Sequence, residues 1–425
     1  MPSYDANEPS DSVKAYHKAL YEFLALYIKT SPGASALLRV AQFPKEYKSA
    51  LIKSHGVPEA LLQPPLLDGK EEDLIEDYVK LLVSKMDEWS GTLMKTEMEA
   101  FVVRAEAPES DDKEHFHTQG VVILFQMLNQ QLELALDSNQ GSILLRLVGE
   151  ANRVLRAVQA QWSRVLASEF RKFAEKKDDV VPGFVEYVMA LANDMVTSAR
   201  NTEAINNRLE PLVSEKYAIP IRDHLAEAQD GFLEVAKECV QILIDSVFSD
   251  LLPATKSLLT PAWYTEDPMS QVTLTLNEYM DDDYRPHLDQ ELWKLLVEDI
   301  VDKFIFTYLV AICRCTKLRI PQAVDRIRAD IDKAVDLFVK FKPGAGLRDD
   351  FQVLEDVLTL IGASKMMVFL EVRPLHSHRA GRRLTSRAVL ALPQGVRHER
   401  LFRRRHHEGA RRPRSERRIG HHGQH

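Results

Sequence analysis

Polar residues in one helical segment of this 425-residue chain are the first candidates for chemistry. Glu186, Asn193 and Asp194 lie within residues 183–201, where apolar residues recur every three or four positions as they do in a helix. Asn and Asp are unfavourable inside helices because their side chains compete for nearby backbone groups. These residues are therefore either ligands or a catalytic pair, or polar groups that fix how two helices pack. We favour the packing and capping role over contact with a partner protein, and both over catalysis.

A pair of histidines, His115 and His117, is the second candidate, in the acidic segment 107–120. The acidic residues next to the pair are Asp111, Asp112 and Glu114. Imidazole and carboxylate groups together could bind a divalent metal ion. We favour a solvated loop here, because Pro, Gly, Asp and Ser are concentrated in the segment.

Two aspartate-containing segments invite comparison with all-α terpenoid synthases, which hold magnesium on D-D-x-x-D and N-D-x-x-S-x-x-x-E motifs. The sequence has DDDYR at 281–285 and NDMVTSARN at 193–201. Arg285 and Asn201 stand where each motif needs its last carboxylate, and the two motifs come in reverse order. An arginine would repel the metal ion, so this enzyme class is the weakest alternative.

Other catalytic signatures are missing from the sequence. It contains no G-x-x-x-x-G-K-[ST], H-E-x-x-H or G-x-S-x-G motif. Cys313 and Cys315 are too close together for the usual cysteine pair of a zinc site. We therefore expect a protein that is not an enzyme, with no catalytic residue, no cofactor and no metal site.

The composition limits the location and the partners. Residues 371–425 hold 15 Arg, no Lys and 4 Glu, a net charge of +11, so the first 370 residues carry −19 of the total of −8. Nucleic-acid binding is not expected of such an acidic body, because it needs clustered Lys and Arg. Three cysteines and an N-terminus without an apolar signal segment indicate a cytosolic protein. The longest apolar run, 304–313, is too short to cross a membrane, so any membrane contact is expected to be peripheral.

Helical periodicity dominates the first 370 residues. Long apolar stripes follow one another, and segments rich in Pro, Gly, Asp and Ser separate them. Only in residues 271–277 do polar and apolar residues alternate as they do in a strand. The sequence offers no second strand to pair with this segment, so we expect it to be helical. The predicted fold is all-α, an elongated stack of antiparallel helical bundles forming a helical rod. The expected parts are a bundle over 1–180, a second over 181–370 and a tail over 371–425.

The tail differs sharply from the body. It holds eight of the 14 histidines and shows no sustained helical stripe. Its low apolar content and high charge predict disorder. The abrupt loss of Lys leaves two origins open, a genuine polybasic tail or an artefact of a shifted reading frame or an unspliced intron.

The four tryptophans are candidates for partner contacts, because exposed Trp often anchors interfaces. Trp89, Trp162 and Trp293 lie on helical stripes, which favours core packing. Trp263 lies in the proline-containing segment 259–268 and is the best candidate for a partner contact.

Several segments in order resemble one protein family, the exocyst subunits of the Sec-six type. They are VEYVMALANDM (185–195), DEWSGTLMKTE (87–97), TQGVVILFQMLNQQLELALDS (118–138), EKYAIPI (215–221), DGFLEVAKECVQILI (230–244), SDLLPATKSLLTPAWY (249–264) and VTLTLNEYMDDDYRPHLDQELWKLLVEDIVDKFIFTYLVAI (272–312). Each motif alone is weak, but their shared order over roughly 70–370 is specific. Residues 1–70 resemble the family less clearly, and the tail does not resemble it.

The resemblance implies a non-catalytic role. Members of this family are helical-rod subunits of the exocyst, which tethers and docks secretory vesicles at the plasma membrane during exocytosis. The implied partners are the other exocyst subunits and SNARE proteins, at cytoplasmic sites of secretion peripheral to the plasma membrane. The family's N-terminal coiled-coil segment is not present before Met1, so the chain is expected to be a fragment or a mispredicted gene model. The alternative is a helical adaptor of another vesicle-tethering complex.

Overall fold

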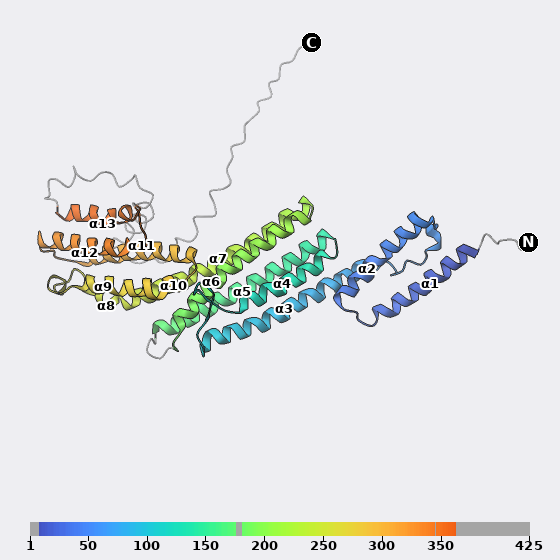
Figure 1. Cartoon of the computed structure of the whole chain (residues 1–425), viewed down its shortest axis with the longest axis horizontal. Helices are drawn as coiled ribbons and strands as arrows, with labels where there is room; N and C mark the ends of the chain where they lie inside the picture. Colours follow the sequence, from blue (N-terminus) through green and yellow to red (C-terminus); the bar gives the residue numbers. More distant parts are fainter. Residues whose placement is uncertain (1–7, 176–180, 345, 363–425) are drawn as a thin grey trace, which may run out of the picture. The chain divides into compact units, whose positions relative to one another are not determined.

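The structure is a computed structural model, and it describes residues 8–175, 181–344 and 346–362. These residues are helical apart from connecting segments and one pair of two-residue strands (Figure 1). The predicted all-α class is therefore confirmed, and 271–277 is helical as expected. Contacts divide the chain into two units, residues 1–351 and 352–425. The tail predicted for 371–425 lies outside the described residues.

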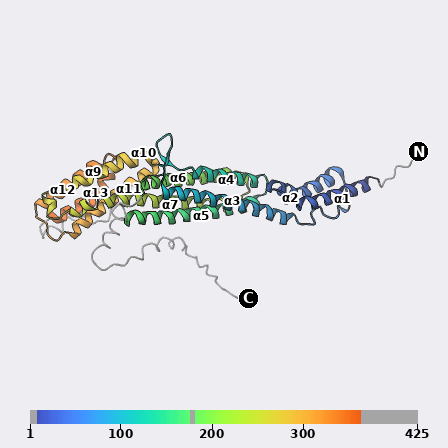
Figure 2. The same cartoon turned by 90° about the horizontal axis from the view of Figure 1, so that it is seen from below.

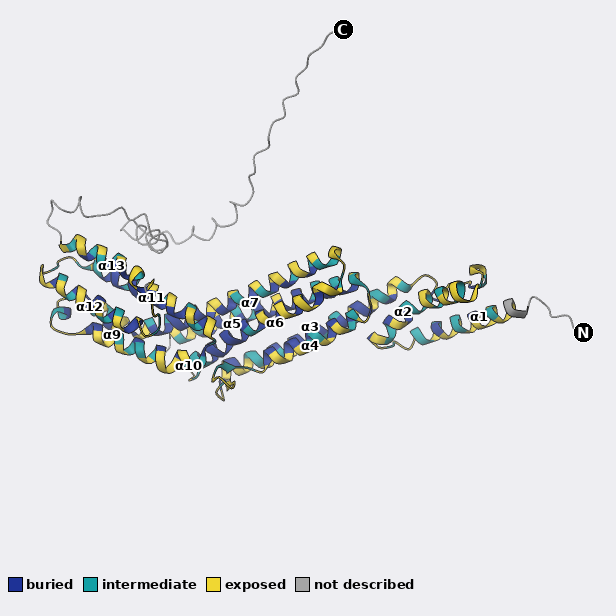
Figure 3. Ribbon diagram, turned by 45° about the horizontal axis from the view of Figure 1, so that its top comes forward, coloured by how far each residue is buried: buried dark blue, intermediate teal, exposed yellow. Residues whose placement is uncertain are grey.

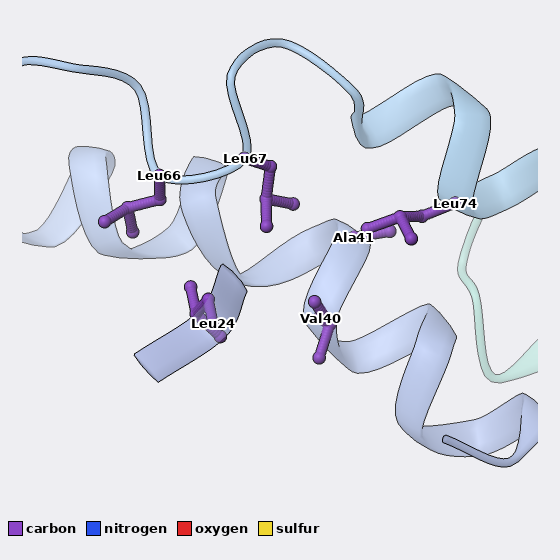
Figure 4. Packing of buried hydrophobic residues seen from close by; sticks show 6 residues of the cluster. All are labelled: Leu24, Val40, Ala41, Leu66, Leu67 and Leu74. Atoms are coloured by element: carbon purple, nitrogen blue, oxygen red, sulfur yellow. The ribbon is translucent and has the colours of Figure 1, made fainter. Parts of the chain in front are cut away.

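The first unit begins with helices that pack around a small apolar core (Figure 4). The elements are α1 (Glu8–Ile28), α2 (Ala34–Ser49), the π-helical turn η1 (Ala50–Ser54) and the 3-10 turn η2 (Glu59–Leu61). The buried residues of the core are Leu24, Val40, Ala41, Leu66, Leu67 and Leu74. Leu66 and Leu67 belong to the segment that leads into α3 (Glu71–Val103), so this core joins the first two helices to the next bundle.

Long helices form the next bundle of the first unit, where they lie side by side (Figure 1). They are α3, α4 (Gly120–Leu136), α5 (Gly141–Glu175), α6 (Phe184–Leu209) and α7 (Glu215–Asp250), with the 3-10 turn η4 (Glu210–Leu212) between the last two. Apolar side chains at helical spacing face inward, as the alternation of buried and exposed residues shows (Figure 3). Helix α7 packs on α5 as well as on α6. The division into bundles over 1–180 and 181–370 stays a prediction.

Shorter elements complete the first unit. They are α8 (Leu252–Ser257), η5 (Ala262–Tyr264), α9 (Pro268–Asn277), the π-helical η6 (Glu278–Tyr284), α10 (Arg285–His287), α11 (Gln290–Arg314) and α12 (Gln322–Phe338). Helix α13 (Gly346–Gly362) begins in this unit and continues into the second. Within the first unit, Phe351 of α13 packs beside Phe304 and Phe338, with ring centroids 6.1 Å from each. The apolar run 304–313 lies in α11, where Ile305 and Tyr308 are buried.

A glycine in the middle of α7 allows α5 to approach closely. Gln159 of α5 is buried and donates a hydrogen bond of 2.7 Å from Nε2 to the carbonyl oxygen of Ala228. One turn further along α7, a Cβ atom at Gly231 would overlap with the side chains of Gln159 and Arg156. Since glycine is otherwise unfavourable inside a helix, this close contact explains why the residue suits the position.

We predict that Gly231→Ala destabilises the fold by about 1–3 kcal/mol, because the buried amide of Gln159 must move to make room for the methyl group. The measurement is the shift of the urea midpoint for the full chain. Gly91→Ala on α3 is the matched control, since a Cβ atom there meets no other atom within 4 Å. That variant should gain up to about 1 kcal/mol from helix propensity. Equal effects of the two substitutions would contradict the assigned contact.

Candidate functional site

One stretch of α6 faces two connecting segments that are distant in sequence. The first is a hairpin, residues 109–117, whose strands β1 (Glu109–Ser110) and β2 (Phe116–His117) pair antiparallel. The second is the connection from α10 to α11, at residues 287–290. The hairpin segment, drawn in teal, projects beside α6 and α10 in Figure 2. We call the contacts of Asn193, Asp194 and Arg200 with these two segments the polar joint.

Both polar atoms of the Asn193 side-chain amide form hydrogen bonds in the polar joint. Its Nδ2 donates to the carbonyl oxygens of Phe116 and His287, each at 2.8 Å. Its Oδ1 accepts a hydrogen bond of 2.8 Å from the backbone N–H of Asp289. The side chain is only 1% exposed. Because a buried amide must be hydrogen-bonded to avoid a desolvation cost, these bonds permit one arrangement of the hairpin and the α10–α11 connection.

Asp194 connects α6 to the end of the hairpin. Its Oδ1 accepts from Nδ1 of His117 at 2.9 Å, and its Oδ2 accepts from the backbone N–H and the hydroxyl of Thr118 at 3.0 and 2.8 Å. Burial raises the pKa of Asp194, and the hydrogen bonds from His117 and Thr118 act against that rise. The hydrogen bond to Asp194 in turn raises the pKa of His117 above its ordinary value.

Arg200 and Asp289 form the third part of the joint. Arg200 is two helical turns after Asn193, so both side chains are on the same face of α6. Its guanidinium binds the carboxylate of Asp289 at 2.8 and 3.1 Å and that of Glu291 at 2.9 Å. Asp289 also caps α11, because its Oδ1 accepts from the backbone N–H of Glu291 at 2.9 Å. The hydrogen bond to Asp289 raises the pKa of Arg200, which therefore stays charged.

The packing role expected for the polar residues of α6 is thus visible for Asn193 and Asp194. Their polar atoms are occupied by other groups of the protein within a buried region. Glu186 behaves differently: it is half-buried in the first turn of α6 and takes no part in the joint. A carboxylate at that place interacts favourably with the positive end of the helix dipole.

The expectation of a solvated loop over 107–120 was incomplete. Residues 109–117 form a hairpin, and Phe116 stacks on His287 with ring centroids 4.0 Å apart. On this hairpin one ligand atom from each of Asp111, His115 and His117 lies within 4.8 Å of the others. Among the residues that the structure describes, this is the one group of His, Cys, Asp or Glu with spacing suited to a metal ion. Sequence reasoning named the residues but had no means of finding the hairpin that brings them together.

The two aspartate-containing segments do not form a magnesium cluster in the described structure. Asp281, Asp282 and Asp283 are exposed on η6, and Asp281 pairs with Arg285 at 3.2 Å. Asp194, the acidic residue of the other segment, bonds the hairpin instead. The carboxylates therefore do not converge on a common point, as the terpenoid-synthase comparison would require.

The premise for choosing Trp263 as a partner contact was wrong. Trp263 is fully buried, and its Nε1 donates a hydrogen bond of 2.8 Å to the carboxylate of Asp330. Tyr308 donates to the same carboxylate at 2.8 Å, and the guanidinium of Arg326 lies 5.3 Å from the indole centroid. The proline-containing segment thus packs inward because α12 supplies a buried acceptor. By contrast, Trp89 and Trp293, for which the helical stripes predict core packing, are only half-buried.

A surface groove between α2, η1 and the α4–α5 turn is another place where ionisable groups gather. The groove contains a histidine, His17. Its Nε2 is 2.8 Å from the carbonyl oxygen of Pro64, and its Nδ1 is 3.2 Å from the hydroxyl of Tyr47. Gln42, also in the groove, donates from Nε2 to the carbonyl oxygen of Ser138 at 2.7 Å. These polar groups therefore join segments of the fold to one another.

Comparisons with known proteins agree on one family. A family model described as exocyst complex component Sec6 matches residues 11–379. The chain is 28% identical over 365 residues to exocyst complex component SEC6 of Saccharomyces cerevisiae, which covers 81% of this chain and 45% of that protein. It is 25% identical over 360 residues to exocyst complex component sec6 of Schizosaccharomyces pombe, covering 84% of this chain and 47% of that protein. The chain spans about half the length of these curated relatives.

A solved structure extends the likeness to the fold. The crystal structure of the C-terminal domain of the exocyst subunit Sec6p matches with a TM-score of 0.67 and 26% identity, over 76% of this chain and 91% of that one. The crystal structure of M-Sec, 14% identical with a TM-score of 0.57, supports the fold alone. Among the described residues, no helix combines the length and the apolar character that crossing a membrane demands.

We predict that Asn193→Ala lowers the free energy of unfolding by about 2–4 kcal/mol, because it leaves two carbonyl oxygens and one N–H without their partner. The measurement is thermal and urea unfolding of the full chain. Asn201→Ala is the matched control on the same helix, since Asn201 makes no side-chain hydrogen bond to any described residue. It should change stability by less than about 1 kcal/mol. A neutral Asn193→Ala would show that the polar joint does not contribute to the fold.

Proposed function

Because the chain belongs to the exocyst complex component Sec6 family, we propose that it acts as a non-catalytic subunit of the exocyst vesicle-tethering complex. Its role would be to scaffold the protein–protein contacts that dock secretory vesicles at the plasma membrane in exocytosis. The observation that carries the proposal is the family match over residues 11–379, joined to the helical fold shared with the C-terminal domain of Sec6p.

The chemistry of the described residues supports a scaffold over an enzyme. The buried polar groups of the joint, Asn193 and Asp194, are satisfied by backbone and side-chain partners of the fold. The buried carboxylate of Asp330 is likewise occupied by Trp263 and Tyr308. Such groups specify how helices pack. A catalytic site would instead need titratable groups that converge on a cavity open to a substrate.

The proposed partners are the other exocyst subunits and SNARE proteins. The proposed location is the cytoplasm, peripheral to the plasma membrane at sites of secretion. The charge supports protein partners over nucleic acid, because the first 370 residues carry −19 and would repel a phosphate backbone. A scaffold of this kind acts through its surfaces, so its partners would recognise the exposed faces of the helices.

We predict that the folded full chain, immobilised and incubated with cytosolic extract, recovers other exocyst subunits in preference to other tethering complexes. The readout is mass spectrometry of the bound proteins, and circular dichroism confirms that the bait is helical. A heat-unfolded bait of the same sequence is the control for binding to exposed apolar surface. Recovery of Golgi or endosomal tethering subunits instead would favour the alternative of an adaptor in another complex.

A second experiment tests direct binding of SNARE proteins and of membranes separately. Purified SNARE proteins and liposomes of plasma-membrane composition are added to the chain one at a time. Binding of SNARE proteins without the other subunits would support a direct contact. If exocyst subunits are recovered but neither SNARE proteins nor liposomes bind, the scaffold role stands and these two contacts are not made by this chain.

A further inference from the structure

We propose that the hairpin binds one divalent transition-metal ion of the zinc type through Asp111, His115 and His117. This site is distinct from the scaffold role and does not depend on it. It is carried by three observations: the spacing of the ligand atoms, the backbone bonds that hold the hairpin turn, and the buried carboxylate that orients one of the imidazoles.

The ligand atoms lie close to the spacing that a tetrahedral ion requires. Oδ2 of Asp111 lies 3.4 Å from Nδ1 of His115 and 3.6 Å from Nε2 of His117, and all three atoms lie within 4.8 Å of one another. With metal–ligand bonds of about 2.0–2.1 Å, two ligands of a tetrahedral zinc ion are about 3.3 Å apart. A movement of less than about 1 Å in the two histidines would therefore complete the site.

The hairpin turn fixes the carboxylate of Asp111 in advance. Its Oδ1 accepts from the backbone N–H groups of Lys113 and His115 at 2.8 and 2.9 Å. The backbone N–H of Asp111 donates to the carbonyl oxygen of His115 at 2.9 Å, which closes the turn. One carboxylate oxygen is thus used by the backbone, while the other faces the two imidazoles. This division of roles leaves Oδ2 for a metal ion.

Asp194 orients His117 for metal binding. A carboxylate accepts hydrogen bonds, so Nδ1 of His117 must be the nitrogen that donates to Asp194, and Nε2 keeps its lone pair toward Asp111 in the neutral imidazole. Asp194 is itself held by Thr118 and is 2% exposed. An imidazole that binds metal through one nitrogen and donates to a buried carboxylate through the other is a recurrent arrangement in metal sites.

The ligand set selects the class of ion. Two imidazoles and one carboxylate suit zinc and its transition-metal neighbours, whereas calcium and magnesium prefer oxygen ligands alone. Three protein ligands leave a fourth position for water, since all three side chains are partly exposed. Because His117 bonds to Asp194 of α6, bound metal would also strengthen the attachment of the hairpin to the polar joint.

The test must separate this site from the eight histidines of residues 371–425, which could also bind zinc. The full chain is treated with a chelator, dialysed, and titrated with ZnCl2, and both bound zinc per chain and Tm are measured. We expect zinc to raise Tm by about 3 °C, because an ion that binds only the folded hairpin stabilises it.

Two variants remove the site without removing the hairpin. Asp111→Asn keeps an oxygen for the backbone N–H groups but replaces the metal-facing oxygen, and His115→Ala deletes one imidazole. Each should bind one zinc fewer per chain at zinc concentrations that saturate the wild type and lose the zinc-dependent rise in Tm. His55→Ala, which removes an exposed histidine outside the hairpin, is the control and should keep both.

Unchanged Tm of the two variants without zinc, together with loss of the zinc effect, would support the site. If zinc raises Tm equally in the wild type, Asp111→Asn and His115→Ala, the ion binds elsewhere and the proposal is overturned. Zinc binding that leaves Tm of the wild type unchanged would also overturn it, because such binding does not involve the folded hairpin.

Discussion

The buried amide of Asn193 is the contact on which the middle of the structure depends. It hydrogen-bonds the hairpin on one side and the α10–α11 connection on the other, at residues 77 and 94 positions away in sequence. Without it, three partly buried backbone groups would lose a partner, at a cost of up to about 1–3 kcal/mol for each group left unsatisfied. Asp194 adds hydrogen bonds to the end of the hairpin, and Arg200 adds ion pairs to the α10–α11 connection, so both segments are attached to α6 by more than one side chain.

The polar joint explains why a helix with strong apolar periodicity carries Asn and Asp near its middle. Contacts between apolar helix faces are non-directional, so neighbouring helices could shift along each other with little change in the buried area. Hydrogen bonds are directional and are lost when groups move by an ångström or two. A buried amide with three partners therefore selects one register among several that the apolar contacts would accept.

The sequence predicted the fold class well and the polar partners poorly. Periodicity assigned the helical faces, and even 271–277, with its strand-like alternation, was correctly expected to be helical. The packing role of Asn193 followed from its unfavourable place in a helix, but its partners lie in segments whose proximity no local pattern encodes. The expected exposure of Trp263 was wrong for the same reason: its proline-containing segment indicated a surface loop, while the buried acceptor, Asp330, comes 67 residues later. The hairpin was missed because two-residue strands leave no period to detect.

A scaffold and an enzyme use buried polar groups in opposite ways. An enzyme leaves some of them unsatisfied until a substrate arrives, which costs stability and creates reactivity. In this chain the residues that resembled catalytic motifs, Asn193 and Asp194, bond to the fold itself, and Asp281 is exposed and pairs with Arg285. Their chemistry contributes fixed geometry between helices. A protein that acts through the positions of its surfaces needs this property, because partners that bind exposed helix faces depend on those faces keeping their register.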